Sequence, residues 1–320
     1  TAGASTPAWM IQRVLDRLRQ QMRPRPASPA EKLRGALDAV VISKVSAALG
    51  AALMVFANAT LGGYAFSWAA AFIAACYIFG MYALNQLSDA QTLKHNEPEK
   101  LRFYLRHQRA ITAAAGAAVA AALAAAAALG PSAALLYVLA LLMGLAYTVK
   151  WLPRNETLRV HRLKDIPASK DVFVGVAWVM VTVVVPALAS GGGLLEAGVG
   201  VAAVFTFTLV YIRSVLSDIR DIHGDRLVGR ETIPILIGKT ATKFFLGALC
   251  AGLAGGLIAA AAAGWVGAFG YVALGAVAYT ALYLALYHWR VISRGVAFDL
   301  AIDGVFHVTG ALALVWIFIA

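Results

Sequence analysis

Residues 111–130 read ITAAAGAAVAAALAAAAALG, a stretch without one charged side chain. A helix needs about 20 apolar residues to cross the ~30 Å hydrocarbon core of a bilayer. A strand of a membrane barrel would instead alternate polar and apolar residues over about ten positions. This stretch therefore predicts a membrane-spanning α-helix.

The composition of the whole chain agrees with a membrane protein. Of its 320 residues, 61% are hydrophobic and 13% are charged, and the mean hydropathy is +0.76. Such a chain cannot cover the surface of a soluble domain with polar groups. We therefore expect an all-α, polytopic membrane bundle of about nine transmembrane helices, near residues 37–57, 65–87, 110–130, 133–149, 171–189, 198–217, 241–264, 267–288 and 299–319.

Lysine and arginine are concentrated in every second connection between the predicted spans. They occur in the N-terminal arm and near 88–109, 150–170, 218–240 and 289–298, but not near 58–64, 130–133, 190–197 or 264–267. The positive-inside rule places basic connections in the cytoplasm. This predicts a prokaryotic inner-membrane protein with a cytoplasmic N-terminus and an outer C-terminus. Topology also explains the net charge of +11 without a nucleic-acid partner.

Residues 1–36 are predicted to form a basic arm ahead of a single transmembrane domain at 37–320. The segment PAWMIQRVLDRLRQQM from Pro7 places Trp9, Ile11 and Leu15 on one side of a helix and arginines on the other. This pattern is typical of an interfacial helix on an anionic leaflet. A disordered basic arm is the alternative. Nothing in the arm resembles a cleavable signal peptide.

Two acidic clusters lie at the cytoplasmic ends of predicted spans. Asn85 and Asp89 are four residues apart and share a helix face. Asp218, Asp221 and Asp225 follow at spacings of three and four in SDIRDIHGD. Opposed carboxylates repel one another unless a cation lies between them, and oxygen-only ligands suit magnesium. Basic residues that would complement a phosphate-rich ligand surround the same region: Lys150, Arg162, Lys164, Arg226 and Arg230.

These motifs resemble the UbiA superfamily of intramembrane prenyltransferases. The second cluster is similar to the family pattern of an Asp, a Gly-Asp pair, a Gly-Arg pair and a Thr-x-Pro turn, carried here by Asp221, Gly224, Asp225, Gly229, Arg230, Thr232 and Pro234. The first cluster resembles the family's Asn-rich motif at Asn85 and Asp89. Asn96-Glu97-Pro98 is similar to its continuation in chlorophyll-synthase-like members. Tyr147 with Lys150 resembles the family's Tyr and Lys pair at a shorter spacing.

The first motif departs from the family pattern. Gln86 and Leu93 stand where family members usually carry Asp, so only one carboxylate remains. The family's Arg-Pro-x-x-x-Gly stretch is replaced by EKLRFYLRH from Glu99. These differences leave the number of metal ions and the class of acceptor open.

The resemblance implies magnesium-dependent transfer of a prenyl group from a polyprenyl diphosphate to an electron-rich acceptor, such as an aromatic quinone precursor, in the membrane. Asp89, Asp221 and Asp225 would be catalytic. Together with Asn85, and with Asp218 as a further candidate, they would hold magnesium on the diphosphate. Lys150, Arg162, Lys164 and Arg230 would bind the diphosphate itself.

The last predicted span carries Asp299, Asp303 and His307 at intervals of four, which makes a polar stripe descending into the membrane. Such residues seldom face lipid. With Tyr147, Asp303 and His307 would form an acceptor-side wall. The alternative for this stripe is interhelical hydrogen bonding.

Two other functions stay open. The first is a variant of the same fold that transfers another phosphate-activated group or binds prenyl lipids with weak catalysis. A cation-coupled transporter would instead place its carboxylates near the bilayer midplane on broken helices, whereas these clusters lie at the ends of spans. The acceptor, the prenyl length and the oligomeric state do not follow from the sequence.

Overall fold

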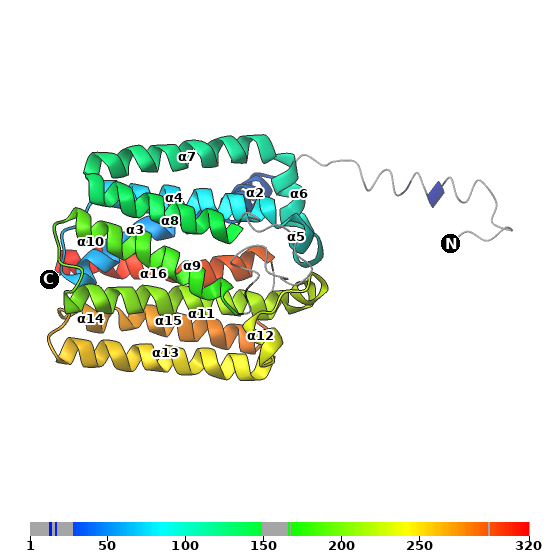
Figure 1. Cartoon of the computed structure of the whole chain (residues 1–320). Helices are drawn as coiled ribbons and strands as arrows, with labels where there is room; N and C mark the ends of the chain where they lie inside the picture. The colour runs from blue at the N-terminus through cyan, green and yellow to red at the C-terminus, as the bar shows by residue number, and fades with distance from the viewer. Residues whose placement is uncertain are drawn as a thin grey trace. The chain divides into compact units, whose positions relative to one another are not determined.

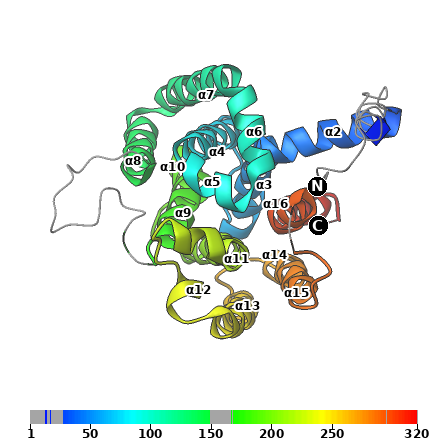
Figure 2. The ribbon, with the colours of Figure 1, turned by 90° about the vertical axis from the view of Figure 1, so that its right-hand side faces the viewer.

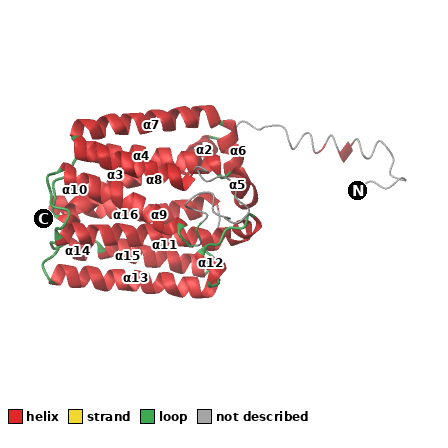
Figure 3. Ribbon diagram, viewed as in Figure 1, coloured by secondary structure: helices red, strands yellow, loops and turns green. Residues whose placement is uncertain are grey.

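The computed structural model describes residues 13, 14, 17, 28–148, 166, 168–293 and 295–319, which form helices and connecting loops but no strands (Figure 3). The chain divides into two units, Thr1–Ala39 and Val40–Ala320. Most of the predicted interfacial helix from Pro7 lies outside the described residues. The helices are α2 Pro29–Ile42, α3 Val45–Gly62, α4 Trp68–Ser88, α5 Ala90–Asn96, α6 Pro98–Arg106, α7 Gln108–Leu129, α8 Pro131–Thr148, α9 Lys170–Val179, the π-helix η2 Met180–Val184, α10 Val185–Ala189, α11 Ala197–Leu227, α12 Ile233–Leu236, α13 Lys239–Ala262, α14 Phe269–Val272, α15 Leu274–His288 and α16 Gly295–Ile319.

Nine helical segments in the described part of the chain are long and apolar enough to cross a membrane, which confirms the predicted architecture. The first span was predicted wrongly, because it begins at Val45 rather than near residue 37. Lys44 adopts a left-handed backbone conformation with φ 68° and separates α2 from α3. The sixth span continues beyond residue 217 to Leu227, so the second acidic cluster lies on regular helix.

The second unit is a bundle in which α4 packs against α3 and α7, α3 against α16, and α11 against α9 and α13. Figure 2 shows these helices nearly end on. The short helices α5, α6 and α12 lie together at one end of the bundle (Figure 1). The C-terminal ends of α4 and α11 reach the same end. The two acidic clusters, which are far apart in sequence, therefore lie at one end of the bundle.

A buried polar network joins three helices in the interior of the second unit. Pro186 has no backbone N–H, and the Thr182 carbonyl instead accepts a hydrogen bond of 3.1 Å from the Asn58 Nδ2. Thr206 Oγ1 donates to Asn58 Oδ1 at 3.0 Å. The Asn58 side chain therefore satisfies the Thr182 carbonyl in the π-helical turn, as the interior of a membrane requires.

Candidate functional site

A polar cavity of about 120 Å³ lies at the end of the bundle that carries α5 and α6. Its walls come from α4, α5, α6, α8, α9, α11, α16 and the loop after α11. Both acidic motifs contribute to it. Its lining includes the side chains of Lys44, Tyr82, Asn85, Gln86, Asp89, Leu93, Asn96, Glu97, Lys100, Tyr147, Lys170, Arg213, Arg220, Asp221, Arg230 and Asp299.

The second acidic motif joins the first across this cavity. Arg230 Nη2 lies 2.9 Å from Asp89 Oδ2, and its Nη1 lies 3.7 Å from Asp225 Oδ1. Gly229 has φ 71°, which a glycine adopts without strain. The chain can therefore turn back after α11 so that the Arg230 N–H donates to the Asp225 carbonyl at 2.9 Å. This turn aims the arginine between the two carboxylates.

The electrostatics of Arg230 follow from these neighbours. Burial alone would lower the pKa of the guanidinium, but Asp89 and Asp225 more than offset burial, so its pKa is raised above the ordinary value. Arg230 therefore stays charged in the site. A guanidinium held between the two acidic motifs is suited to bind a phosphate group there.

Behind Arg230, three carboxylates are buried beside one ammonium group. Lys170 forms an ion pair with Asp218, and Ser214 Oγ donates to Asp171 Oδ1 at 2.5 Å. Within the described residues, one oxygen each of Asp171, Asp218 and Asp225 has no hydrogen-bond partner. Buried carboxylate oxygens without a partner are costly. They therefore leave unused ligand capacity close to the cavity.

Asp221, the remaining acidic residue of the second motif, belongs to a separate ion network. The guanidinium of Arg220 binds both oxygens of Asp221 at 2.8 Å and reaches Asp299 at 2.9 Å and Glu97 at 3.2 Å. Lys100 pairs with Glu97 at 2.7 Å and also with Asp299. This network ties the connection between α5 and α6 to α11 and α16, which closes one side of the cavity.

Gly224 allows α5 to approach α11 closely. A Cβ atom at this position would lie 2.5 Å from Asn96 Cγ and 2.8 Å from Asn96 Nδ2. Both distances are too short for a Cβ atom while Asn96 keeps this rotamer. The glycine next to Asp225 therefore has a packing reason, since it lets the end of α5 cover the acidic motif.

A second cluster of ions lies deeper, where α3 and α11 meet α16. Arg213 Nε and Nη2 donate to Asp303 Oδ1 at 2.7 and 2.5 Å, and Lys44 Nζ lies 3.6 Å from Asp303 Oδ2. Arg213 Nη1 also donates to the Tyr82 hydroxyl at 3.3 Å. Asp303 thus joins helices, the alternative considered for the polar stripe. Asp303 and His307 are not among the described residues that line the polar cavity or the apolar pocket beside it.

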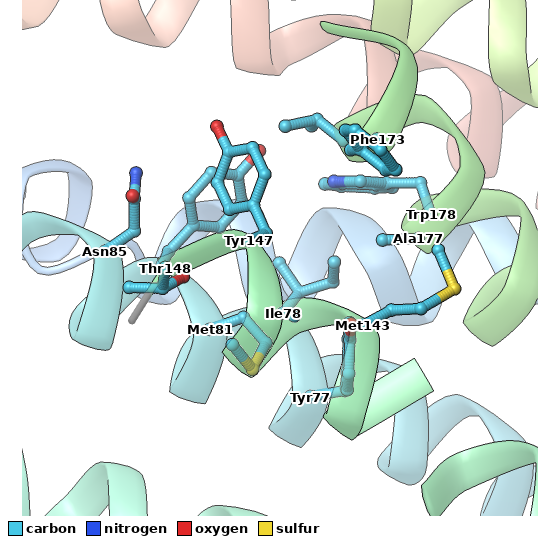
Figure 4. Close-up of a pocket in the computed structure, with 13 residues that line it drawn as sticks. Tyr77, Ile78, Met81, Asn85, Met143, Tyr147, Thr148, Phe173, Ala177 and Trp178 are labelled. Carbon is cyan, nitrogen blue, oxygen red and sulfur yellow. The ribbon is translucent and has the colours of Figure 1, made fainter. Parts of the chain in front are cut away.

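An apolar pocket of about 70 Å³ adjoins the polar cavity (Figure 4). The two share Tyr82, Asn85, Tyr147 and Val174 in their walls. Aromatic and thioether side chains dominate the rest of the pocket, namely Tyr77, Met81, Met143, Phe173 and Trp178. A polar compartment therefore continues directly into an aromatic apolar one.

The structure brings together most of the residues that the sequence singles out. Asn85, Asp89, Asp221 and Arg230 line the polar cavity, Asp218 and Asp225 lie behind it, and Tyr147 borders both compartments. No set of three His, Cys, Asp or Glu side chains in the described residues is arranged to hold a metal ion as it stands. Lys150, Arg162 and Lys164, the other diphosphate-binding candidates, lie outside the described residues.

Several site residues were not predicted from the sequence. Lys170, Asp171, Arg213 and Arg220 all line the polar cavity or contact its acidic groups. The signal was present for Asp171 and Arg213, because ionisable residues inside membrane spans are costly and usually functional. Gln86 and Leu93, the two departures from the family pattern, also line the cavity. Their side chains therefore occupy positions where carboxylates would face it.

Comparisons with known proteins agree on one family. The model of the UbiA prenyltransferase family matches residues 44–302. A UbiA homologue from Aeropyrum pernix K1, in its apo form, has a similar structure with a TM-score of 0.66 and 21% identity, covering 84% of this chain and 98% of that one. A UbiA homologue from Archaeoglobus fulgidus bound to GPP and Mg²⁺ gives a TM-score of 0.63 at 17% identity, covering 88% and 98%.

A curated relative matches over a short segment. Somaliensene A/B synthase from Streptomyces somaliensis is 49% identical over 49 residues. That segment is 15% of this chain and 15% of the relative. The chain thus matches only a small part of the length of that protein.

Proposed function

Because the chain belongs to the UbiA prenyltransferase family, we propose that it transfers a prenyl group from a polyprenyl diphosphate to an electron-rich, lipophilic or aromatic acceptor in the membrane. The observation that carries this proposal is the junction of the polar cavity with the aromatic pocket. A polyprenyl diphosphate has the same division, since a charged head is joined to an apolar chain. The bond that breaks lies between the two parts, where Tyr147 and Asn85 border both compartments.

The acidic groups fit a magnesium ion. Carboxylate and amide oxygens are the donors that magnesium prefers, and Asp218 and Asp225 each have a buried oxygen without a hydrogen-bond partner among the described residues. Asn85, Asp89, Asp221 and Asp225, with Asp218, would hold the ion. When bound, magnesium would neutralise charge on the departing diphosphate. The relative from Archaeoglobus fulgidus supports this choice of metal, because its structure contains GPP and Mg²⁺.

The chain's own residues then perform three tasks. Arg230 lies where it can meet the diphosphate, and its charge would stabilise the leaving group as the C1–O bond breaks. Tyr82, Tyr147 and Trp178 line the apolar pocket, where their rings would stabilise an allylic cation. The same apolar walls exclude water, which would otherwise capture that cation.

The test uses the purified full chain, magnesium, polyprenyl diphosphates of several lengths and a set of quinone precursors, with products identified by mass spectrometry. Asp225→Asn should abolish turnover while the protein still folds, since it removes a carboxylate without changing its size. Glu196→Gln, at the N-terminus of α11, is the matched control and should keep full activity. Equal activity in the two variants would place the reaction elsewhere.

A second reaction class is favoured by a specific observation. The aromatic walls of the apolar pocket suit intramolecular capture of the cation, and the short match is to a protein named as a synthase, Somaliensene A/B synthase. In that case the C1–O bond breaks, C1 joins an alkene of the same chain, and a proton leaves the resulting cation. The same incubation without an acceptor distinguishes the two, because only the intramolecular reaction releases a hydrocarbon in its absence.

We also propose that the end of the bundle with α5, α6 and α12 faces the cytoplasm of a prokaryotic inner membrane, with the N-terminus inside. The basic connections named above support this orientation. Residues 37–320 would then act as one transmembrane domain behind a basic arm.

A further inference from the structure

A second polar pocket, of about 500 Å³, lies between α11, α13 and α15. It is lined by Ile219, Arg220, His223, Lys239, Lys243, Tyr287, Arg290 and Ser293. Arg220 belongs to both this pocket and the polar cavity, and it is already held by acidic residues on the cavity side. The remaining basic side chains play no part in the proposed reaction.

In the part of the chain that the structure describes, these basic side chains are not paired with acidic residues. Among the described residues, no Asp or Glu forms an ion pair with Lys239, Lys243 or Arg290, and the Lys243 ammonium lies 5.3 Å from the centre of the Tyr287 ring. Lys239 and Lys243 are one turn apart on α13, where like charges repel. Both also lie near the N-terminus of a long helix, whose dipole adds positive potential. The described lining of the pocket is therefore strongly positive, which suits an anionic ligand.

The backbone directs one of these cations with a costly conformation. Arg290 has φ 61°, which is unfavourable for a residue with a side chain. Strain of this kind persists where the surrounding structure requires it, and it is found at ligand sites. Here it places an arginine on the short connection that follows α15, opposite the lysines of α13.

An apolar groove of about 550 Å³ lies between α13 and α15, next to the pocket along both helices. Gly247 follows Lys243 by one turn of α13, and Leu284 precedes Tyr287 by nearly one turn of α15. Along α13 the groove extends to Ile258, about 17 Å at 1.5 Å per residue. A Cβ atom at Gly247 would meet no atom within 4 Å, so the groove is open there.

Large exposed apolar side chains are the sequence neighbours of residues that line the pocket. Trp289 and Val291 flank Arg290 with 69% and 67% exposure, and Phe244 next to Lys243 is 77% exposed. Tryptophan is enriched where a membrane surface meets water. In a bilayer, this position would put the pocket at the depth of the lipid head groups and the groove among the acyl chains.

We propose that the pocket and the groove together bind an anionic phospholipid. Its phosphate lies among Lys239, Lys243 and Arg290, and one acyl chain lies in the groove between α13 and α15. Charge complementarity favours an anionic head group. In a zwitterionic lipid, the cationic group of the head group offsets the negative charge of the phosphate that the protein's cations attract. Basic pockets between transmembrane helices recognise lipid head groups in this way.

Native mass spectrometry of the detergent-purified full chain tests this site, with phosphatidylglycerol, phosphatidylcholine or inorganic phosphate added. Phosphatidylglycerol should remain bound, and the double variant Lys239→Gln/Lys243→Gln should bind it roughly 30-fold more weakly, since each cation near an anionic head group contributes about a factor of five. The matched control Arg106→Gln/Arg109→Gln removes two exposed cations elsewhere and should bind within about twofold of the unaltered protein.

A second pair of variants tests the groove without touching a charge. Gly247→Leu should fill the groove and displace phosphatidylglycerol, whereas Gly252→Leu, which is also open but does not line the groove, should not. Thermal melting of each variant monitors folding. Equal retention of phosphatidylcholine, equal losses in the two double variants, or displacement of the lipid by inorganic phosphate alone would overturn the proposal. So would a dimer that Gly247→Leu dissociates, because the groove would then hold a second copy of the chain.

Discussion

Replacement of Gly224 by alanine tests whether α5 must lie close against α11 for the site to work. The new Cβ would overlap Asn96 Oδ1 and lie 2.5 Å from Asn96 Cγ, whereas ordinary contacts begin near 3.4 Å, so the required shift is at least about 1 Å. The end of α5 must therefore move by about 1 Å, or Asn96 must adopt another rotamer. Overpacking of this kind costs about 1–3 kcal/mol of stability. Because Asn96 and the neighbouring Glu97 line the polar cavity, a displacement of about 1 Å would lower kcat/KM by roughly 100-fold.

The assay is prenyl transfer at several donor concentrations, together with thermal melting. Gly200→Ala is the matched control, because it lies on the same helix and its added Cβ would meet nothing within 4 Å. The double variant Gly224→Ala/Asn96→Ala removes the overlapping side chain and should recover activity relative to Gly224→Ala alone. The packing explanation would be refuted if Gly224→Ala behaved like Gly200→Ala, or if the double variant were the less active of the two.

Four further outcomes are expected. Asn58→Leu should lower the free energy of unfolding by about 1–2 kcal/mol, measured by denaturant titration in detergent, because it leaves the Thr182 carbonyl without its donor. Arg230→Gln should raise the KM for the donor about tenfold in steady-state kinetics, since a charged partner of the diphosphate is lost. Leu93→Asp should lower the magnesium concentration for half-maximal activity, and an unchanged magnesium titration in the folded variant would remove position 93 from the metal site. A tag before Thr1 should be reached by an impermeant label only from the cytoplasmic side, and one after Ala320 only from the other, so labelling of both from one side would contradict the orientation.

Helical periodicity in the sequence was sufficient to predict the second acidic motif. Asp218, Asp221 and Asp225 share a face only if the helix continues past the apolar segment, and α11 does continue to Leu227. The spans themselves follow from local hydropathy, because each helix satisfies its own backbone hydrogen bonds within the membrane. The first span is the exception. Its start depends on the left-handed conformation of Lys44, which hydropathy does not report.

Hydropathy and residue spacing therefore predict local features: the helices, their lengths, and the residues that share one face. Packing between the helices determines which faces meet. Asp89 and Arg230 pair across 141 positions of the chain, and Arg220 reaches both Glu97 and Asp299. The spacing of residues along one helix carries no information about the helix opposite, since that partner is chosen by packing over the whole bundle. The junction of polar cavity and apolar pocket, and the basic pocket above an apolar groove, exist only after α4, α11, α13 and α15 have packed together.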